Sequence, residues 1–260
     1  MEVVDLPTEL EPLYFVCLAD WSPEIKEMGT KKERWYRNKK EKGLRVKVAK
    51  DGNGVVGGMI HYLPIEESNA EGRDLYFVNC IWVHRNKQGR GDFTGKGMGT
   101  ALLKAAEQDA KSLGAKGMVA WGLSLPAFMR ASWFKKHGYT KIDRIGAIVL
   151  LWKPFTDTAQ APKWIRAKKT PGRIPGKVSV ACFVSGWCPS MNIVYERAKR
   201  AAAEFGDRVE FTEYDTLDRR VFHEWGMMDA LFVDDREVRT GPPPSYDKIR
   251  KKISKRIQRL

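Results

Sequence analysis

The chain has 260 residues, 43% of them hydrophobic, and a formal net charge of +14. This length and composition can build two hydrophobic cores, which excludes global disorder. No run approaches the roughly 18 apolar residues that a membrane span needs. The acidic start, residues 1–5, does not resemble a secretory signal, so we expect a cytoplasmic protein.

The chain contains four cysteines and four histidines. No two cysteines form a C-x-x-C pair, so we expect neither a structural zinc site nor any other metal site. In a reducing compartment we expect thiols rather than a disulfide framework. The cysteines are Cys17, Cys80, Cys182 and Cys188.

Positive charge is concentrated in two segments. Residues 153–177 and residues 246–260 each hold seven basic residues and one acidic residue. Such clusters can bind nucleic acid, an anionic membrane surface or nucleotide phosphates. The alternative is that they are solvated basic faces with no partner.

Residues 1–152 predict a mixed α/β domain. The turn Asp51-Gly52-Asn53-Gly54 predicts a hairpin, and Gly114 predicts a helix end. The expected elements are helices over 10–18 and 25–42, strands over 45–49, 55–62 and 74–83, a helix over 99–113, a strand over 116–121, a helix over 126–138 and a strand over 144–152.

Residues 153–177 contain four prolines and many charges, which predicts a linker. Residues 178–260 then predict a second α/β domain. Its expected elements are strands over 177–184, 209–214 and 230–233, and helices over 190–204 and 245–260. The last helix carries an apolar stripe of isoleucines on one face.

A glycine-rich turn follows the apolar strand that ends at Val83. It reads Thr94-Gly95-Lys96-Gly97-Met98-Gly99-Thr100. Its glycines allow close approach of the backbone, and the following helix presents free N–H groups and a positive dipole end, so a diphosphate suits it. A P-loop would need Ser or Thr after Lys96, and a dinucleotide fingerprint would need an acidic residue after the next strand. A tight turn without a ligand is the remaining alternative.

The combination of two motifs resembles the GNAT superfamily of N-acetyltransferases. The family's pyrophosphate motif, Gln/Arg-x-x-Gly-x-Gly/Ala, matches residues 94–99 except at the first place. A later motif, an aromatic pair, two polar residues and Gly-aromatic, appears over residues 133–139. The resemblance covers roughly residues 1–152.

The resemblance implies a GNAT fold and acetyl-CoA as co-substrate. The cofactor-binding residues would be Gly95, Lys96, Gly97, Met98, Gly99, Thr100 and Phe134 near the pyrophosphate and thioester, with Ile81, Trp82 and Val83 pairing with the pantetheine arm. Residues 118–121 would splay from that strand. A neutral amine of a small molecule or an amino-acid-like substrate would attack the thioester directly.

The sequence departs from the family pattern at the proton donor. Phe134 stands where the family has a tyrosine, so Ser132 and Tyr139 are the candidate substitutes. Candidate bases are Tyr76 and Asp74, with His84 and His137 as alternatives. The expected acceptor region is residues 21–37 and the loop 64–67.

The second domain resembles a thioredoxin-like fold, because Cys188 lies between an apolar strand and a helix start. Met191 replaces the second cysteine, and Asp229 stands where the family has a cis-proline. We expect Cys182 to face the core. The segment after residue 240 resembles a YoaP-like domain. Cys188 is therefore either a monothiol, redox or binding site, or part of a purely structural fold. A thiol or redox enzyme that binds CoA only for recognition is the alternative function.

Overall fold

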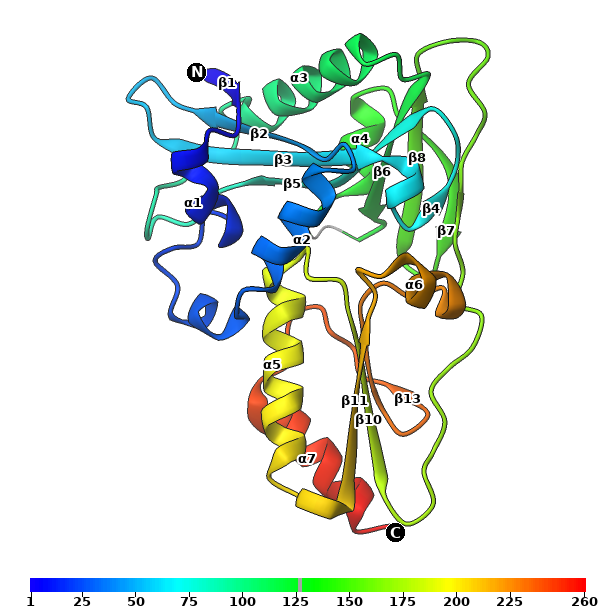
Figure 1. The fold of residues 1–260 in the computed structure, drawn as a ribbon. Helices are drawn as coiled ribbons and strands as arrows, with labels where there is room; N and C mark the ends of the chain where they lie inside the picture. The colour runs from blue at the N-terminus through cyan, green and yellow to red at the C-terminus, as the bar shows by residue number, and fades with distance from the viewer. Residues whose placement is uncertain (126–127) are drawn as a thin grey trace. The chain divides into compact units, whose positions relative to one another are not determined.

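The computed structural model describes residues 1–125 and 128–260 (Figure 1). The chain forms two compact units. We call them the N-terminal unit, Met1–Trp21 with Asn38–Ile165, and the C-terminal unit, Ser22–Arg37 with Arg166–Leu260. The C-terminal unit thus includes an early segment of the chain. The expected domain limits of 1–152, 153–177 and 178–260 stay a prediction.

A seven-stranded sheet forms the frame of the N-terminal unit, in the order β1-β2-β3-β5-β6-β8-β7. Among the strands in the described residues of this sheet, β5 and β6 are the only parallel neighbours, and helix α3 (Met98–Ser112) connects them, as a parallel pair requires. The strands are β1 (Glu2–Asp5), β2 (Arg45–Lys50), β3 (Val56–Pro64), β5 (Leu75–Val83), β6 (Gly117–Leu123), β7 (Thr140–Ile145) and β8 (Ile148–Pro154). This mixed sheet with its helices confirms the expected α/β class.

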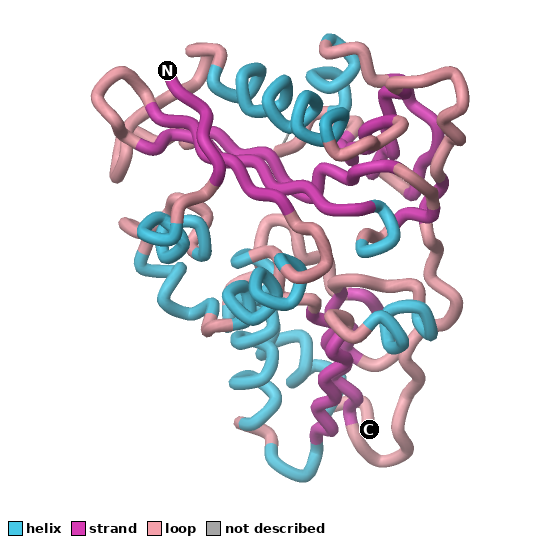
Figure 2. The backbone as a smooth tube through the Cα atoms, turned by 45° about the horizontal axis from the view of Figure 1, so that its top comes forward, coloured by secondary structure: helices cyan, strands magenta, loops and turns pink. Residues whose placement is uncertain are grey.

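The core of this unit lies between the sheet and α3 (Figure 2). Leu102, Ala106 and Ala110 recur at helical spacing and are fully buried. The smaller elements of the unit are η1 (Thr8–Leu10), α1 (Glu11–Phe15), η3 (Ile65–Glu67), α4 (Ala131–Lys136) and the strand pair β4 (Ala70–Glu71) and β9 (Lys163–Trp164).

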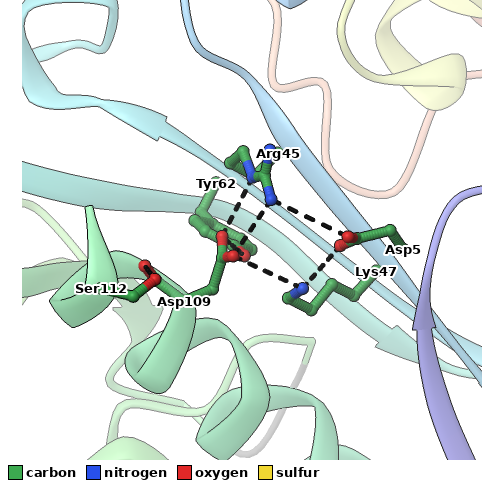
Figure 3. Close-up of polar contacts among 6 residues, drawn as sticks. All are labelled: Asp5, Arg45, Lys47, Tyr62, Asp109 and Ser112. Carbon is green, nitrogen blue, oxygen red and sulfur yellow. Dashed lines mark hydrogen bonds and ion pairs between the residues drawn. The ribbon is translucent and has the colours of Figure 1, made fainter.

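A polar cluster fastens the C-terminal half of α3 to the sheet (Figure 3). Arg45 donates two hydrogen bonds of 3.0 Å to the Asp109 carboxylate, and the Tyr62 hydroxyl donates a third of 2.5 Å. Lys47 Nζ lies 3.7 Å from Asp109 and 2.6 Å from Asp5. Burial alone would raise the pKa of Asp109, but the hydrogen bonds from Arg45 and Tyr62 bring it below its usual value. The charged carboxylate therefore stabilises the position of α3.

A four-stranded sheet, in the order β11-β10-β12-β13, forms the C-terminal unit. Strand β10 pairs parallel with β11 and antiparallel with β12. Helices α5 and α7 share one apolar cluster with the sheet, and a second cluster includes Trp225 of α6. The elements are η2 (Pro23–Met28), α2 (Lys31–Lys40, which continues into the N-terminal unit), β10 (Val178–Val184), α5 (Pro189–Ala203), η4 (Gly206–Arg208), β11 (Val209–Asp215), α6 (Arg219–Trp225), β12 (Ala230–Val233), β13 (Arg236–Glu237) and α7 (Tyr246–Ile257).

Two expected elements are divided in the structure, each at a glycine with positive φ. Gly29, at φ +62°, separates η2 from α2, so residues 25–42 are not one helix. Gly146, at φ +55°, turns the strand expected over 144–152 into the hairpin of β7 and β8. Positive φ is inexpensive only for glycine, which makes these positions turns. The helix expected over 126–138 begins only at Ala131, and residues 126–127 lie outside the described residues.

The expected linker also contains regular structure. Within 153–177, β9 pairs with β4, and Trp164 is buried against the Phe77 ring at 6.1 Å. The first part of this segment therefore packs on the N-terminal unit. Among the described residues, no helix has both the length and the apolar character of a membrane span.

Candidate functional site

Strands β5 and β6 diverge halfway along their length. Their parallel register runs from Leu75 opposite Gly117 to Val78 opposite Ala120. Both strands continue, to Val83 and to Leu123, but the described residues record no further pair between them. The strand edges beyond Val78 thus form an opening in the middle of the sheet. The splaying that the resemblance implied at residues 118–121 begins only at Trp121, because residues 118–120 remain paired with residues 76–78 of β5.

A β-bulge marks the start of this opening. On β3, His61 lies opposite Cys80 and Tyr62 lies opposite Val78, so Asn79 is the extra residue of β5. Asn79 Nδ2 lies 3.4 Å from His61 Nε2, and the Tyr14 hydroxyl lies 3.1 Å from His61 Nδ1. These three side chains are buried. A polar chain behind β5 therefore supports the bulge.

Aromatic side chains flank the opening. The Trp121 indole N–H donates a 2.8 Å hydrogen bond to the Asn79 carbonyl, in place of a backbone bond between the strands. The Phe128 ring lies 5.7 Å from that of Trp82 and 6.0 Å from that of Trp121. All three rings are half-buried, so part of each remains open to a ligand.

The glycine-rich turn leaves open space at the start of α3. Gly95 and Gly97 have φ of +76° and +77°, and a Cβ atom on either would meet no described atom within 4 Å. Gly97 is the N-cap of α3, where the structure records no side-chain cap. The first N–H groups of a helix have no partner within it. The turn therefore leaves room for a ligand beside these amides, and the phosphate site expected here stays a prediction.

Two glycines on β3 set the position of this turn. A Cβ on Gly57 would lie 2.6 Å from the Phe93 ring, and one on Gly58 would lie 3.0 Å from the Met98 sulfur. Phe93 and Met98 are buried there, just before and at the start of α3. The missing side chains on β3 thus let both ends of the turn dock onto the sheet.

A histidine also lies at the start of α3. His137 Nε2 is 3.0 Å from the Thr100 hydroxyl, and His137 Nδ1 is 2.8 Å from the Trp133 carbonyl. The Trp133 ring packs on the imidazole, with centroids 4.2 Å apart, and would touch a Cβ on Gly99 at 3.4 Å. Sequence reasoning considered His137 only as a base. The structure brings it instead to the expected pyrophosphate position.

The candidate proton donors are placed differently. Phe134 and Tyr139 are buried in the core, with ring centroids 5.5 Å apart. Burial, followed by the Glu107 carboxylate, raises the pKa of Tyr139 well above its usual range. Ser132 is exposed in the first turn of α4. Of the two expected substitutes, only Ser132 is accessible in this structure.

The candidate bases early in β5 lie away from the opening. Tyr76 is in the paired part of β5, with its ring 5.9 Å from that of Tyr62, and burial raises its pKa. Asp74 precedes the strand and pairs with Lys116 at 2.9 Å. Both positions argue against a direct role at a thioester held between β5 and β6.

His84 has a structural environment. It accepts a 2.9 Å hydrogen bond from the Trp21 indole at Nε2, and its Nδ1 lies 2.7 Å from the Gly91 carbonyl. These two hydrogen bonds hold the loop before the glycine turn. In the expected acceptor loop, Glu67 pairs with Lys39 at 2.6 Å, and residues 22–37 belong to the C-terminal unit.

The C-terminal unit has its own strand-to-helix junction. Cys188 is the N-cap of α5 and is half-buried. The Asp229 carboxylate accepts hydrogen bonds from the Ser185 N–H at 2.9 Å, the Ser185 hydroxyl at 3.0 Å and the Trp187 indole at 2.8 Å. Burial outweighs these neutral donors and raises the pKa of Asp229 to about 6. Asp229 therefore fixes the loop before Cys188.

Cys182 is buried in β10, within the cluster formed with α5 and α7, as expected. Burial raises the pKa of its thiol well above the usual range. All four cysteines are described, and none is in a disulfide. In the described part of the chain, no three His, Cys, Asp or Glu side chains gather as a metal site would require.

Comparison with known proteins identifies one domain. Residues 42–141 match the family model described as the acetyltransferase (GNAT) domain. No curated protein gives a significant match to the chain.

Solved structures of acetyltransferases are similar at low identity. A ribosomal-protein-alanine N-acetyltransferase from Brucella melitensis is 17% identical, with 60% of this chain and 100% of that chain covered and a TM-score of 0.45. A GNAT family N-acetyltransferase from Escherichia coli, in complex with CoA, is 13% identical, with 63% and 88% covered and a TM-score of 0.44. An IAA acetyltransferase from Bacillus cereus is 22% identical, with 59% and 99% covered and a TM-score of 0.39. Likeness at these values does not extend to a substrate.

The matched region contains the features described above: the diverging strands, the bulge, the glycine turn and helix α4. It ends two residues after Tyr139, and the C-terminal unit has no match to a family model. Residues 42–141 therefore carry a GNAT acetyltransferase domain, and the expectation that this protein is an acyltransferase is confirmed.

Proposed function

We propose that the protein is an acetyl-CoA-dependent N-acetyltransferase that acts on a small amine or an amino-acid-like molecule. The proposal depends on one observation: the opening between β5 and β6 leads along β5 to the glycine-rich turn at the start of α3. The strand diverges from β6 after Val78, and its end at Val83 lies beside the open start of α3, because a Cβ on Gly99 would be 3.6 Å from the Val83 side chain. A thioester arm and a diphosphate thus find adjacent sites.

In this proposal the cofactor binds in two parts. The backbone amides of residues 95–100 hold the pyrophosphate, with Lys96 nearby and Met98 contributing only its main chain because its side chain is buried. The unpaired edge at Ile81, Trp82 and Val83 holds the pantetheine arm by main-chain hydrogen bonds. Trp133 takes the place of the buried Phe134 as the aromatic neighbour of the cofactor. His137 contributes indirectly, through its hydrogen bond to Thr100.

The reaction is a direct acyl transfer. The amine nitrogen attacks the thioester carbonyl carbon, a C–N bond forms and the C–S bond breaks. The ammonium must lose a proton before the attack, and the CoA thiolate must gain one. We retain Ser132 as the proton donor because it is exposed in α4, whereas Tyr139 is buried and Tyr76 lies away from the opening.

For the C-terminal unit we propose a thioredoxin-like accessory domain. The order β10-α5-β11-α6-β12-β13-α7 and the central position of β10 in the sheet support this assignment. A thiol or redox function of Cys188 is the alternative, and its position at the N-cap of α5 favours it. A dithiol mechanism would need a second accessible thiol. Cys182 is buried, and the loop around Asp229 contains a carboxylate in place of a thiol.

Isothermal titration calorimetry with acetyl-CoA tests the proposal. We expect one site per chain and competition by CoA, followed by release of free CoA when a panel of small amines is added. Failure to bind any acyl-CoA would overturn the proposal. Binding without transfer to any amine, but with thiol exchange at Cys188, would favour the alternative.

A further inference from the structure

Helix α7 presents two chemically distinct faces. Ile249, Ile253 and Ile257 recur every four residues and are 0%, 0% and 5% exposed, within the cluster formed with α5 and the sheet. This stripe anchors the helix in its own unit. The opposite face is therefore the surface that α7 presents to solvent.

Four lysines occupy that outer face. Lys248, Lys251, Lys252 and Lys255 follow the spacing i, i+3, i+4 and i+7, which places them along one side of a helix. All four are exposed. We call this set the lysine stripe. Arg259, four residues beyond Lys255 and also exposed, extends it past the helix end.

Three acidic groups that lie outside α7 but near it are already paired with arginines. Arg250 pairs with Glu204, and Arg256 pairs with Asp234 at 2.8 Å. Asp235 pairs with Arg173 at 3.1 Å. Within the described ranges, no ion pair is recorded for the lysine stripe. Asp247 in the first turn of α7 offsets one of its four charges, which leaves the lysine stripe with a net charge of +3.

Helix stability does not account for the stripe. The helix dipole favours a cation in the last turn, where Lys255 lies, but disfavours one in the first turn, where Lys248 lies. Like charges at i and i+4 each destabilise a helix by about 0.2–0.5 kcal/mol. The stripe thus carries a small cost for folding, which indicates a role outside it.

The other basic segment of the chain has a different environment. Lys163 pairs with Glu71 at 2.9 Å, and Lys169 pairs with Glu224 at 2.5 Å. Arg173 is paired as described above. Lys153 and Lys177 are also paired, with Glu107 at 2.8 Å and Glu210 at 3.6 Å. Five of the seven basic residues in 153–177 are therefore used within the fold, while the lysine stripe is available to a partner.

We propose that the lysine stripe binds the phosphodiester backbone of a nucleic acid without sequence preference. The stripe rises about 10 Å along the helix, a distance over which one strand of a duplex presents about three phosphates. An anionic bilayer is a poorer partner, because a membrane-binding helix inserts its apolar face, and the isoleucines of α7 are buried in its own unit. Lysines contact phosphates as flexible point charges, which suits backbone binding.

Fluorescence anisotropy with the full chain tests this proposal. The probes are a labelled 20-base-pair DNA duplex and a labelled 20-nucleotide RNA of random sequence, titrated at several salt concentrations. For the duplex, we expect the logarithm of the binding constant to fall with the logarithm of salt at a slope of about −3, as contacts to about three phosphates predict. The variant K248Q/K251Q/K252Q/K255Q should lose most of this slope and bind at least about 10-fold more weakly.

A matched variant removes the same charge elsewhere. Lys104, Lys141, Lys168 and Lys199 are exposed and lie outside α7. The quadruple glutamine variant at these positions should keep the slope, and circular dichroism should show that both variants are folded. Equal loss in both variants would overturn the proposal, since net charge alone would then explain the binding. Absence of binding at low salt, or stripe-dependent binding to anionic phosphatidylglycerol vesicles but to neither nucleic acid, would also overturn it.

Discussion

The two units each contain a junction at which a central apolar strand leads to a long helix, but the junctions differ in what surrounds the helix start. Before α3 stand Gly95 and Gly97, with open space around them. Before α5 stands Cys188, preceded by a loop fixed by the Asp229 carboxylate. Both helices have the positive end of a dipole at this point, but α5 begins with Pro189, which has no N–H, and so offers one donor fewer than α3.

The comparison shows that a helix start becomes an anion site through its surroundings. Lys96 and His137 lie near the start of α3, and a Cβ on Gly95 or Gly97 would meet no described atom within 4 Å. At α5, a buried carboxylate with only neutral hydrogen-bond donors already occupies the loop. A second negative charge is disfavoured there. The same backbone feature thus supports cofactor binding in one unit and not in the other.

The largest expected effect is at Gly97. Gly97→Val would place a branched side chain at φ +77° in the open space of the turn. We expect acetyl-CoA to bind at least about 100-fold more weakly, which corresponds to about 3 kcal/mol. Calorimetry measures this change.

Gly146→Val is the matched control. Gly146 also has positive φ, at +55°, and open space around it, but lies in the turn between β7 and β8. Its substitution should lower the unfolding temperature similarly and leave acetyl-CoA affinity unchanged. Equal loss of affinity in both variants would mean that strain, and not occupation of the site, is responsible.

The second effect concerns the α5 junction and pH. Asp229 has a folded pKa of about 6, above its usual value of 3.8, so the folded state binds the proton more tightly. Its contribution to the free energy of unfolding is greatest below pH 4, falls as pH rises to about 6 and is then constant. The total change is up to about 3 kcal/mol. Urea denaturation of wild type and Asp229→Asn at pH 4.5 and 7.5 measures it.

The informative quantity is the difference between the two proteins. Wild type should lose stability relative to Asp229→Asn as pH rises. Asp207→Asn, in the exposed η4 turn, is the control and should show no such trend. If the difference in the free energy of unfolding stays constant with pH, the pKa of Asp229 is the same in the folded and the unfolded protein, and this prediction is wrong.

A smaller effect is expected at His137. His137→Ala removes a side chain that hydrogen-bonds Thr100 at the start of α3. We expect the KM for acetyl-CoA to rise about 5-fold, or about 1 kcal/mol, with little change in kcat, because the histidine acts on binding. The exposed His223 in α6 supplies the control, His223→Ala, which should leave KM unchanged. A fall in kcat alone would instead indicate a catalytic role for His137.

The smallest effect is expected at Cys188. Cys188→Ser keeps the size of the side chain and removes the thiol at the N-cap of α5. Steady-state acetyl transfer should stay within experimental error of wild type. A loss of 10-fold or more would overturn the accessory assignment and favour the thiol alternative.

Much of the local structure was accessible from the sequence. Strong periodicity and glycine punctuation predicted β5, α3, β10 and α5 to within two residues at each end. The glycine turn could be predicted because Gly95 and Gly97 have a positive φ, which a local sequence pattern of glycines indicates. Helix α6 was missed, although Asp218 as N-cap and Gly226 at the helix end are recognisable signals.

The site itself depends on contacts that no local pattern records. The bulge at Asn79 and its support by His61 require knowledge of strand register. A polar residue in the apolar strand Leu75–Val83 was the available signal for it. The burial of Tyr139 depends on the core around α3, so it could not be read from spacing.

The paired glycines of β3 have a consequence for how this protein can vary. Phe93 and Met98 pack where Gly57 and Gly58 lack side chains. Even an alanine at either glycine would displace the glycine-rich turn from the sheet. A selection that preserves cofactor binding should therefore recover no change at Gly57 or Gly58, although neither is among the residues proposed to hold the cofactor. Polar residues within the loop are free to diverge, whereas the strand beneath it is not.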